Sequence, residues 1–106
     1  MEIYNVDYIP GKNIELIGLV SGTVVKATHV GRDVMAIFKT LVGGEIETYT
    51  EMLTEARTTA LDRMISDAEN QGADAVINVR FGSASLMNGA AEIIAYGTGV
   101  RFLPPE

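Results

Sequence analysis

The sequence contains no cysteine and no tryptophan, and its single histidine is His29. Without cysteine the chain can form neither a disulfide framework nor a thiolate metal site, and it has no thiol nucleophile. One histidine also leaves few ways to orient a general base beside a serine, and no GxSxG, GxGxxG or Walker pattern is present. We therefore expect no enzymatic activity, and the sequence identifies no cofactor.

Basic residues are scarce as well: eight Lys and Arg face fourteen Asp and Glu, for a net charge of −6. Contacts to phosphates need a basic face, so we expect no nucleic-acid partner. No apolar run approaches the ~18 residues of a membrane-spanning helix, which argues against a membrane partner. The first residues include Glu2 and Asp7 instead of a basic and then apolar leader, so we expect a cytoplasmic protein.

Residues 45–72 predict one long helix, roughly 35–40 Å in length at 1.5 Å per residue. Small and apolar residues recur there mostly at steps of three and four, the period of one buried helical face. Gly72 stands where a left-handed helix stop is expected. The residues on the predicted buried face are Tyr49, Met52, Leu53, Ala56, Ala60, Met64, Ile65 and Ala68.

The remaining segments predict strands. Residues 14–27 are rich in β-branched residues and predict a long strand, broken near Ser21-Gly22, after a turn at Pro10-Gly11. Residues 75–81 alternate, with Ala75, Ile77, Val79 and Phe81 on one face, and residues 91–102 form a second strand after a connection at 82–89. A short helical pattern covers residues 32–41. We predict a single domain over residues 1–106, an α+β sandwich of two layers with one long helix on an antiparallel sheet of three strands.

The predicted hairpin has a simple register if it is symmetric about its loop. Arg80 then lies opposite Glu92, and Asn78 lies opposite Ile94. One face of the 91–102 strand carries small residues such as Ala95 that would let a helix approach closely.

Both faces of the predicted sheet are apolar, although the chain offers one long helix to cover them. A sheet that is apolar on both faces needs two covers, so we expect another subunit to form the second layer. The alternative is that the segment around residues 1–9 folds back over this face. The sequence leaves both open, with a homo-oligomer as the working prediction.

Several sequence segments together resemble the YbjQ-like family of small proteins, whose domain is described as heavy-metal-binding. They are Gly43-Gly44-Glu45 before the helix, residues 72–81, and residues 92–98. The resemblance implies a dodecin-subunit-like β-α-β-β fold in which the first strand pairs with the last. It also implies that the subunits form a ring, with a pentamer as the expected assembly.

Metal binding would need donors that are few in this sequence. Soft metals prefer thiolates and imidazoles, so His29 would need partners from carboxylates or from other subunits. Glu47, Glu51 and Glu55 form a ridge on one side of the helix, where a hard cation could lie between subunits. The alternatives are an ordinary turn histidine and a solvated acidic face. The metal candidates are therefore His29, Glu47 and Glu51.

A second group of polar residues is predicted to lie on the sheet face away from the helix. In an oligomer these residues would line a small-ligand pocket between subunits, with Tyr96 as an aromatic wall, or they would act only as polar interface contacts. The sequence thus predicts a homo-oligomer that binds a small ligand or a metal ion at its interfaces, or a purely structural oligomer. The ligand candidates are Asn78, Arg80, Glu92, Tyr96 and Thr98.

Overall fold

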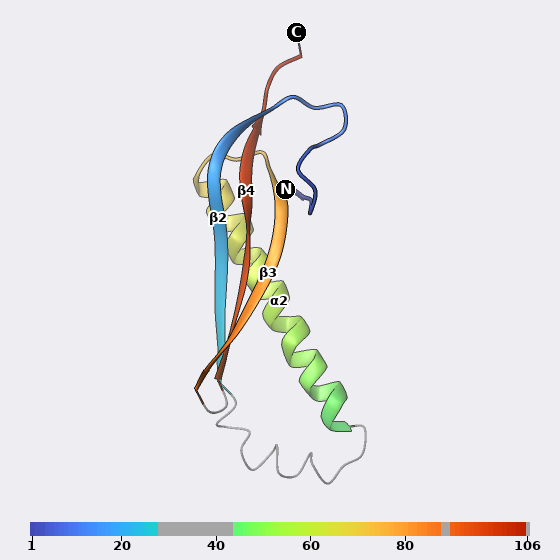
Figure 1. Ribbon diagram of the computed structural model, residues 1–106, viewed down its shortest axis with the longest axis vertical. Helices are drawn as coiled ribbons and strands as arrows, with labels where there is room; N and C mark the ends of the chain where they lie inside the picture. Colours follow the sequence, from blue (N-terminus) through green and yellow to red (C-terminus); the bar gives the residue numbers. More distant parts are fainter. Residues whose placement is uncertain (28–43, 88–89, 106) are drawn as a thin grey trace.

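The computed structural model describes residues 1–27, 44–87 and 90–105, with side chains for 1–26, 50–85 and 90–105. The described elements lie in two layers, with a long helix packed on one face of a four-stranded sheet (Figure 1). The predicted short helix at residues 32–41 lies outside the described residues. In chain order the elements are β1 (Glu2–Ile3), β2 (Ile14–Ala27), α2 (Gly44–Asn70), β3 (Ala75–Met87) and β4 (Ala90–Phe102).

The long helix is confirmed, and its end has a clear cause. Gly72 takes a φ of 83°, a conformation that glycine adopts without steric cost. The Gly72 N–H donates to the Glu69 carbonyl at 3.0 Å, and the Ala73 N–H donates to the Ala68 carbonyl at 2.9 Å. These two bonds form a Schellman motif, which satisfies the last carbonyls of the helix. Within the described residues, no helix is long and apolar enough to span a membrane.

The sheet has the strand order β1-β3-β4-β2, and β4 pairs antiparallel with both of its neighbours. The pairing of the first long strand with the last, implied by the family resemblance, is therefore confirmed. The prediction of three antiparallel strands was wrong, because Glu2–Ile3 adds a short parallel strand beside Ala75–Val76. Further backbone bonds join the residues after β1 to β3. In one of them the Val79 N–H donates to the Tyr4 carbonyl at 2.9 Å.

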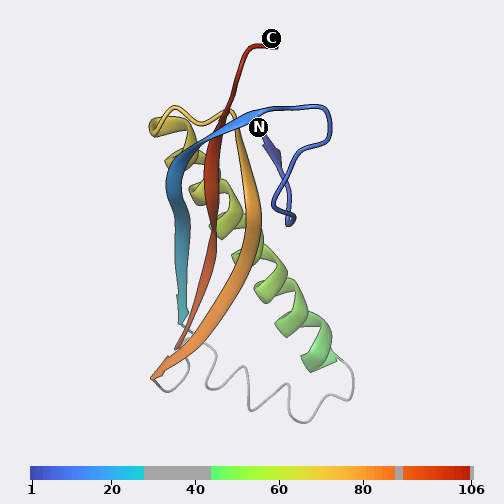
Figure 2. The ribbon, with the colours of Figure 1, turned by 45° about the horizontal axis from the view of Figure 1, so that its top comes forward.

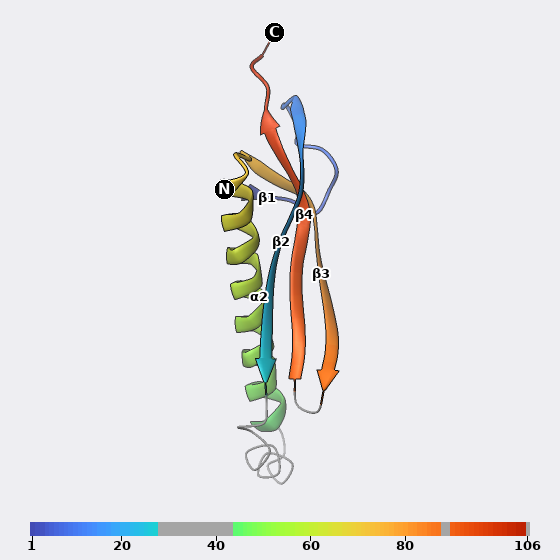
Figure 3. The ribbon, with the colours of Figure 1, turned by 90° about the vertical axis from the view of Figure 1, so that its left-hand side faces the viewer.

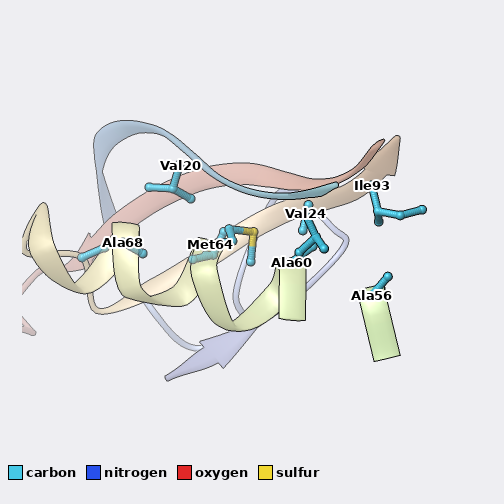
Figure 4. Packing of buried hydrophobic residues seen from close by; sticks show 10 residues of the cluster. Val20, Val24, Ala56, Ala60, Met64, Ala68 and Ile93 are labelled. Carbon is cyan, nitrogen blue, oxygen red and sulfur yellow. The ribbon is translucent and has the colours of Figure 1, made fainter. Parts of the chain in front are cut away.

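The main core lies between α2 and the sheet (Figure 4). Four helix residues at steps of four, Ala56, Ala60, Met64 and Ala68, are fully buried. They pack against residues of β2 and β4, including Val20, Val24 and Ile93. Because three of these four helix side chains are methyl groups, the helix can lie close to the sheet.

Gly22 is the point of closest approach between β2 and α2. A β-carbon built at Gly22 would lie 2.3 Å from the Ala60 carbonyl oxygen and 2.3 Å from the Met64 amide nitrogen. The predicted break of the strand near Ser21-Gly22 was wrong, since β2 runs without interruption through it. Its irregularity lies earlier, between Leu16 and Gly18. The glycine is required by the helix that crosses it.

The register of the hairpin also differs from the prediction. Arg80 pairs with Tyr96, and Glu92 pairs with Ala84. The symmetric register failed because β3 continues to Met87 and contains two irregularities, one between Ile77 and Arg80 and one between Ser85 and Met87.

Asn78 lies at the first irregularity with a φ of 55°, which asparagine tolerates better than most residues. An extra residue reverses the alternation after it. Val76 and Val79 therefore both contribute to the helix-side core, whereas Ile77 packs on the opposite face. The predicted shared face of Ala75, Ile77, Val79 and Phe81 was wrong for its last two members.

The face opposite α2 is covered at one end only. The N-terminal segment crosses to that side of the sheet (Figure 3), where buried Ile9 packs with Ala75, Ile77 and Val100. A turn at Pro10-Gly11 follows as predicted, with the Lys12 N–H donating to the Ile9 carbonyl at 3.1 Å. The alternative that the first residues fold back over the sheet is thus right for this end. No other described segment covers the rest of that face.

Side chains from α2 bond to the middle of the outer edge of β2, at Leu19, Ser21 and Thr23. Arg63 Nη1 donates to the Thr23 carbonyl at 2.6 Å, and Gln71 Nε2 donates to the Leu19 carbonyl at 3.3 Å. Between them, Asp67 Oδ2 accepts from the Ser21 N–H at 2.9 Å, while its Oδ1 accepts from Gln71 at 3.1 Å. These three helix residues, spaced by four, occupy backbone groups that an edge strand would otherwise offer to another strand.

We expect Asp67→Ala to lower the free energy of unfolding by about 1–2 kcal/mol, because it removes a charge-assisted bond to a partly buried N–H. Asp62→Ala is the matched control on the same helix, with an exposed side chain, and should change stability by less than ~0.5 kcal/mol. Urea denaturation at one subunit concentration measures both. Equal stability of the two variants would show that the Asp67 contact does not stabilise the fold.

Candidate functional site

The uncovered part of the sheet carries an unusual number of exposed apolar side chains. We call this surface the open face and define it by Leu16, Leu19, Val25, Ile94 and Tyr96. Leu16 is 71% exposed, Leu19 72%, Val25 55% and Tyr96 38%. Antiparallel sheets that face water normally carry polar side chains on that side. The open face is therefore a candidate contact surface.

The β4 register places four of the five predicted ligand residues on the open face. Arg80 and Tyr96 are direct cross-strand partners, and Thr98 lies two residues further along β4. Glu92 is on the same face but four residues from Tyr96, about 13 Å at the rise of an extended strand. The structure thus brings Arg80 and Tyr96 together, whereas Glu92 lies apart.

Arg80 is already anchored within its own subunit. Its Nη1 donates to the Asn5 carbonyl at 2.8 Å and to the Val79 carbonyl at 3.0 Å. The predicted contact with Glu92 is absent, and among the described residues the one ion pair is Arg101–Glu15, at 4.0 Å. Asn78 uses its backbone N–H to bond the Val6 carbonyl at 2.9 Å, in the irregular part of β3. Its role is thus to hold the N-terminal segment against the sheet.

Of the three predicted metal candidates, only Glu51 has a described side chain. His29 and the Glu47 side chain lie outside the described part of the chain, while Glu51 is exposed on α2. Among the described residues, no group of three or more His, Asp or Glu side chains could hold a metal ion.

A groove lies between α2 and the end of the sheet where β2 and β3 end and β4 begins. It was not predicted from the sequence. We call it the end groove; it has a volume of about 420 Å³. Its polar residues include Lys26, Arg57, Ser83 and Ser85. Lys26 could have been noticed, since it alternates with Val24 on the helix side of β2. The two serines could not, because their face depends on the irregularity at Asn78.

A further hollow of about 550 Å³ lies where the N-terminal segment meets α2 and β3, and it is lined largely by apolar residues. Tyr4 is among them. Desolvation raises the pKa of the Tyr4 hydroxyl, and Glu2 raises it further through a hydrogen bond and through repulsion of the phenolate. Tyr4 therefore stays protonated at neutral pH and supplies no general base there.

A model of the YbjQ family, described as "putative heavy-metal-binding", matches residues 1–103. The chain belongs to this family. A UPF0145 protein of Thermosipho melanesiensis is 54% identical over 107 residues, covering 100% of this chain and 99% of its own. A UPF0145 protein of Thermotoga maritima is 57% identical over 102 residues, covering 95% of this chain and 96% of its own.

The fold of this YbjQ-family chain is also seen in a crystal structure. A protein of unknown function from Pediococcus pentosaceus, assigned to the DUF74 family, superposes with a TM-score of 0.68. The match covers 96% of this chain and 97% of that one at 16% sequence identity. At this identity the likeness establishes the fold alone, because one fold can host unrelated functions.

Proposed function

We propose that this YbjQ-family protein works as a homo-oligomer whose subunits meet across the open face and bind a small ligand there. The observation that carries the proposal is the exposure of Leu16, Leu19 and Val25 on the sheet face opposite α2. Antiparallel sheet faces that meet water normally carry polar side chains, so exposed apolar residues here support a contact. A second copy of the chain is the proposed cover, as the two-sided apolar pattern of the sequence predicts.

The form of the assembly follows from which surfaces are free. The β2 edge is occupied by Arg63, Asp67 and Gln71, which disfavours strand addition there and supports contact through the sheet face. Contacts between different patches close into a ring when the rotation between subunits permits. The family resemblance supports such a ring, with five subunits as the proposed number.

The proposed ligand site lies beside the Arg80–Tyr96 pair. An aromatic ring next to a guanidinium suits a small flat or anionic molecule, and apolar neighbours from an adjoining subunit would exclude water from it. A metal ion is the other proposed occupant, held by donors such as His29 from more than one subunit.

A purely structural assembly without a ligand is the second candidate. It is favoured by the engagement of Arg80 with Asn5 and Val79, and by the distance between Glu92 and Tyr96. Polar side chains arranged in a row are also suited to fixing the register of two faces.

Native mass spectrometry of the freshly purified assembly tests the ligand. We expect a stoichiometric extra mass in the wild type. The double variant Arg80→Gln/Tyr96→Leu should lose it while still assembling, since the introduced leucine side chain keeps an apolar contact. Arg101→Gln, which removes a cation away from the open face, is the control and should retain the mass. Repeated absence of any extra mass in the wild type would instead support the structural assembly.

A further inference from the structure

The end groove lies where α2 separates from the sheet. Figures 1 and 2 both show the helix diverging from the strands toward its N-terminal end. Burial follows the same trend, because Ala60 and Met64 are fully buried whereas Met52 and Leu53 are only partly so. The resulting volume, about 420 Å³, falls within the roughly 300–1,000 Å³ of small-molecule sites.

The sheet register shows how the floor of the groove is built. Lys26 on β2, Ala91 on β4 and Ser85 on β3 form one row across the sheet. With strands about 4.8 Å apart, the outer two backbones are about 10 Å from each other. The methyl group of Ala91 leaves the space between them open, and Ser83 lies in the next row beside Ile93.

The charge of the lining is opposite to that of the chain. Acidic residues outnumber basic ones by fourteen to eight overall, yet the described residues that line the groove include Lys26 and Arg57 and no acidic residue. Among the side chains of residues 1–26, 50–85 and 90–105, no carboxylate lies within ion-pair distance of either cation. Among the described residues Arg57 makes one side-chain bond, from Nη2 to Thr54 Oγ1 at 3.2 Å, and this bond uses one of its five N–H donors.

We propose that the end groove binds a small anionic amphiphile, a free monomeric carboxylate with an unbranched apolar body. Lys26 and Arg57 attract the carboxylate from the sheet and from the helix, and the Ser85 hydroxyl donates a hydrogen bond to it. Met52, Leu53 and Ile93 contact the apolar body. Methionine is suited to this because its unbranched thioether adapts to irregular shapes.

This site goes beyond the proposed function. The groove is bounded by α2 and by the side of the sheet that carries Lys26, Ser83 and Ser85, whereas the open face lies on the other side of the sheet. A variant that blocks assembly through the open face should therefore keep this binding, so the two proposals succeed or fail separately.

Titration calorimetry with decanoate below its micelle concentration tests the proposal. We expect one saturable site per subunit in the wild type. Lys26→Gln/Arg57→Gln should weaken decanoate binding about tenfold, since two partly exposed charge pairs are lost. Lys12→Gln/Arg101→Gln removes the same charge elsewhere and should bind like the wild type. Decan-1-ol should bind more weakly than decanoate and equally to the wild type and to the Lys26/Arg57 variant.

A measurement on the wild type alone tests the same site without depending on whether the variants fold. Decanoate should shift the amide NMR signals of Lys26, Ser85 and Ala91, and leave those of Leu19 and Tyr96 unchanged. No saturable binding, shifts on the open face instead, or equal decanoate affinity in the wild type and a folded Lys26/Arg57 variant would each overturn the proposal.

Discussion

Leu19→Asp should convert the proposed assembly into subunits of 11.4 kDa. In one subunit the Leu19 side chain is 72% exposed, so the substitution costs little stability in an isolated chain. In the proposed contact between neighbouring subunits the same position is buried. There the variant loses the ~1.5–3 kcal/mol of burying a leucine and places an unpaired charge in the interface, at a cost of ~3–5 kcal/mol. Light scattering coupled to size exclusion measures the change.

Leu103→Asp is the matched control for this prediction. Leu103 is also exposed, at 43%, but it follows β4 and lies outside the open face. We expect this variant to keep the mass of the wild type. If Leu19→Asp keeps that mass as well, subunits do not meet across the open face.

Gly22→Ala should destabilise the fold more than any other single methyl group we could add to β2. Its β-carbon would lie 2.3 Å from two backbone atoms of α2 and 2.7 Å from the Arg63 β-carbon. Backbone atoms inside a helix cannot rotate away as a side-chain end can, so the helix must move off the sheet. Overpacking costs ~1–3 kcal/mol where side chains yield, and here we expect at least about 3 kcal/mol. Urea denaturation at a fixed subunit concentration measures the change.

Gly82→Ala provides the comparison for Gly22→Ala. Its added β-carbon would meet the Ile94 Cγ2 methyl at 3.1 Å, the end of a side chain that can shift. We expect a loss below ~1 kcal/mol. Similar losses for the two variants would mean that the approach of α2 to Gly22 is not what fixes the distance between helix and sheet.

The helix was predictable because it follows from a repeated pattern, whereas the pairing of β2 with β4 was implied by the family resemblance. Steps of three and four place Ala56, Ala60, Met64 and Ala68 on one side, and no single residue decides the outcome. The role of Gly22 was not predictable. A glycine in a strand indicates either a break or a close backbone approach, and the choice depends on where a helix much later in the chain crosses the strand.

The candidate site was predicted less well, because its register depends on single residues. One extra residue at Asn78 reverses which face each later β3 residue occupies. That change turned Ser83 and Ser85 toward α2. The partner of Arg80 is Tyr96 instead of Glu92 because β3 continues to Met87, which moves the turn of the hairpin along the chain. The sequence pattern of residues 75–81 alternates smoothly and contains no signal of the irregularity. The apolar residues Leu19, Val25 and Tyr96 on the face opposite α2 do not depend on this detail, because they lie on β2 and β4.

The most direct test of the proposed homo-oligomer is the absolute mass of the wild-type protein, measured by light scattering across a range of concentrations. The account predicts a defined multiple of 11.4 kDa, five subunits in the proposed ring, with Leu19 and Val25 buried between neighbours. A constant mass of one subunit at every concentration would contradict it.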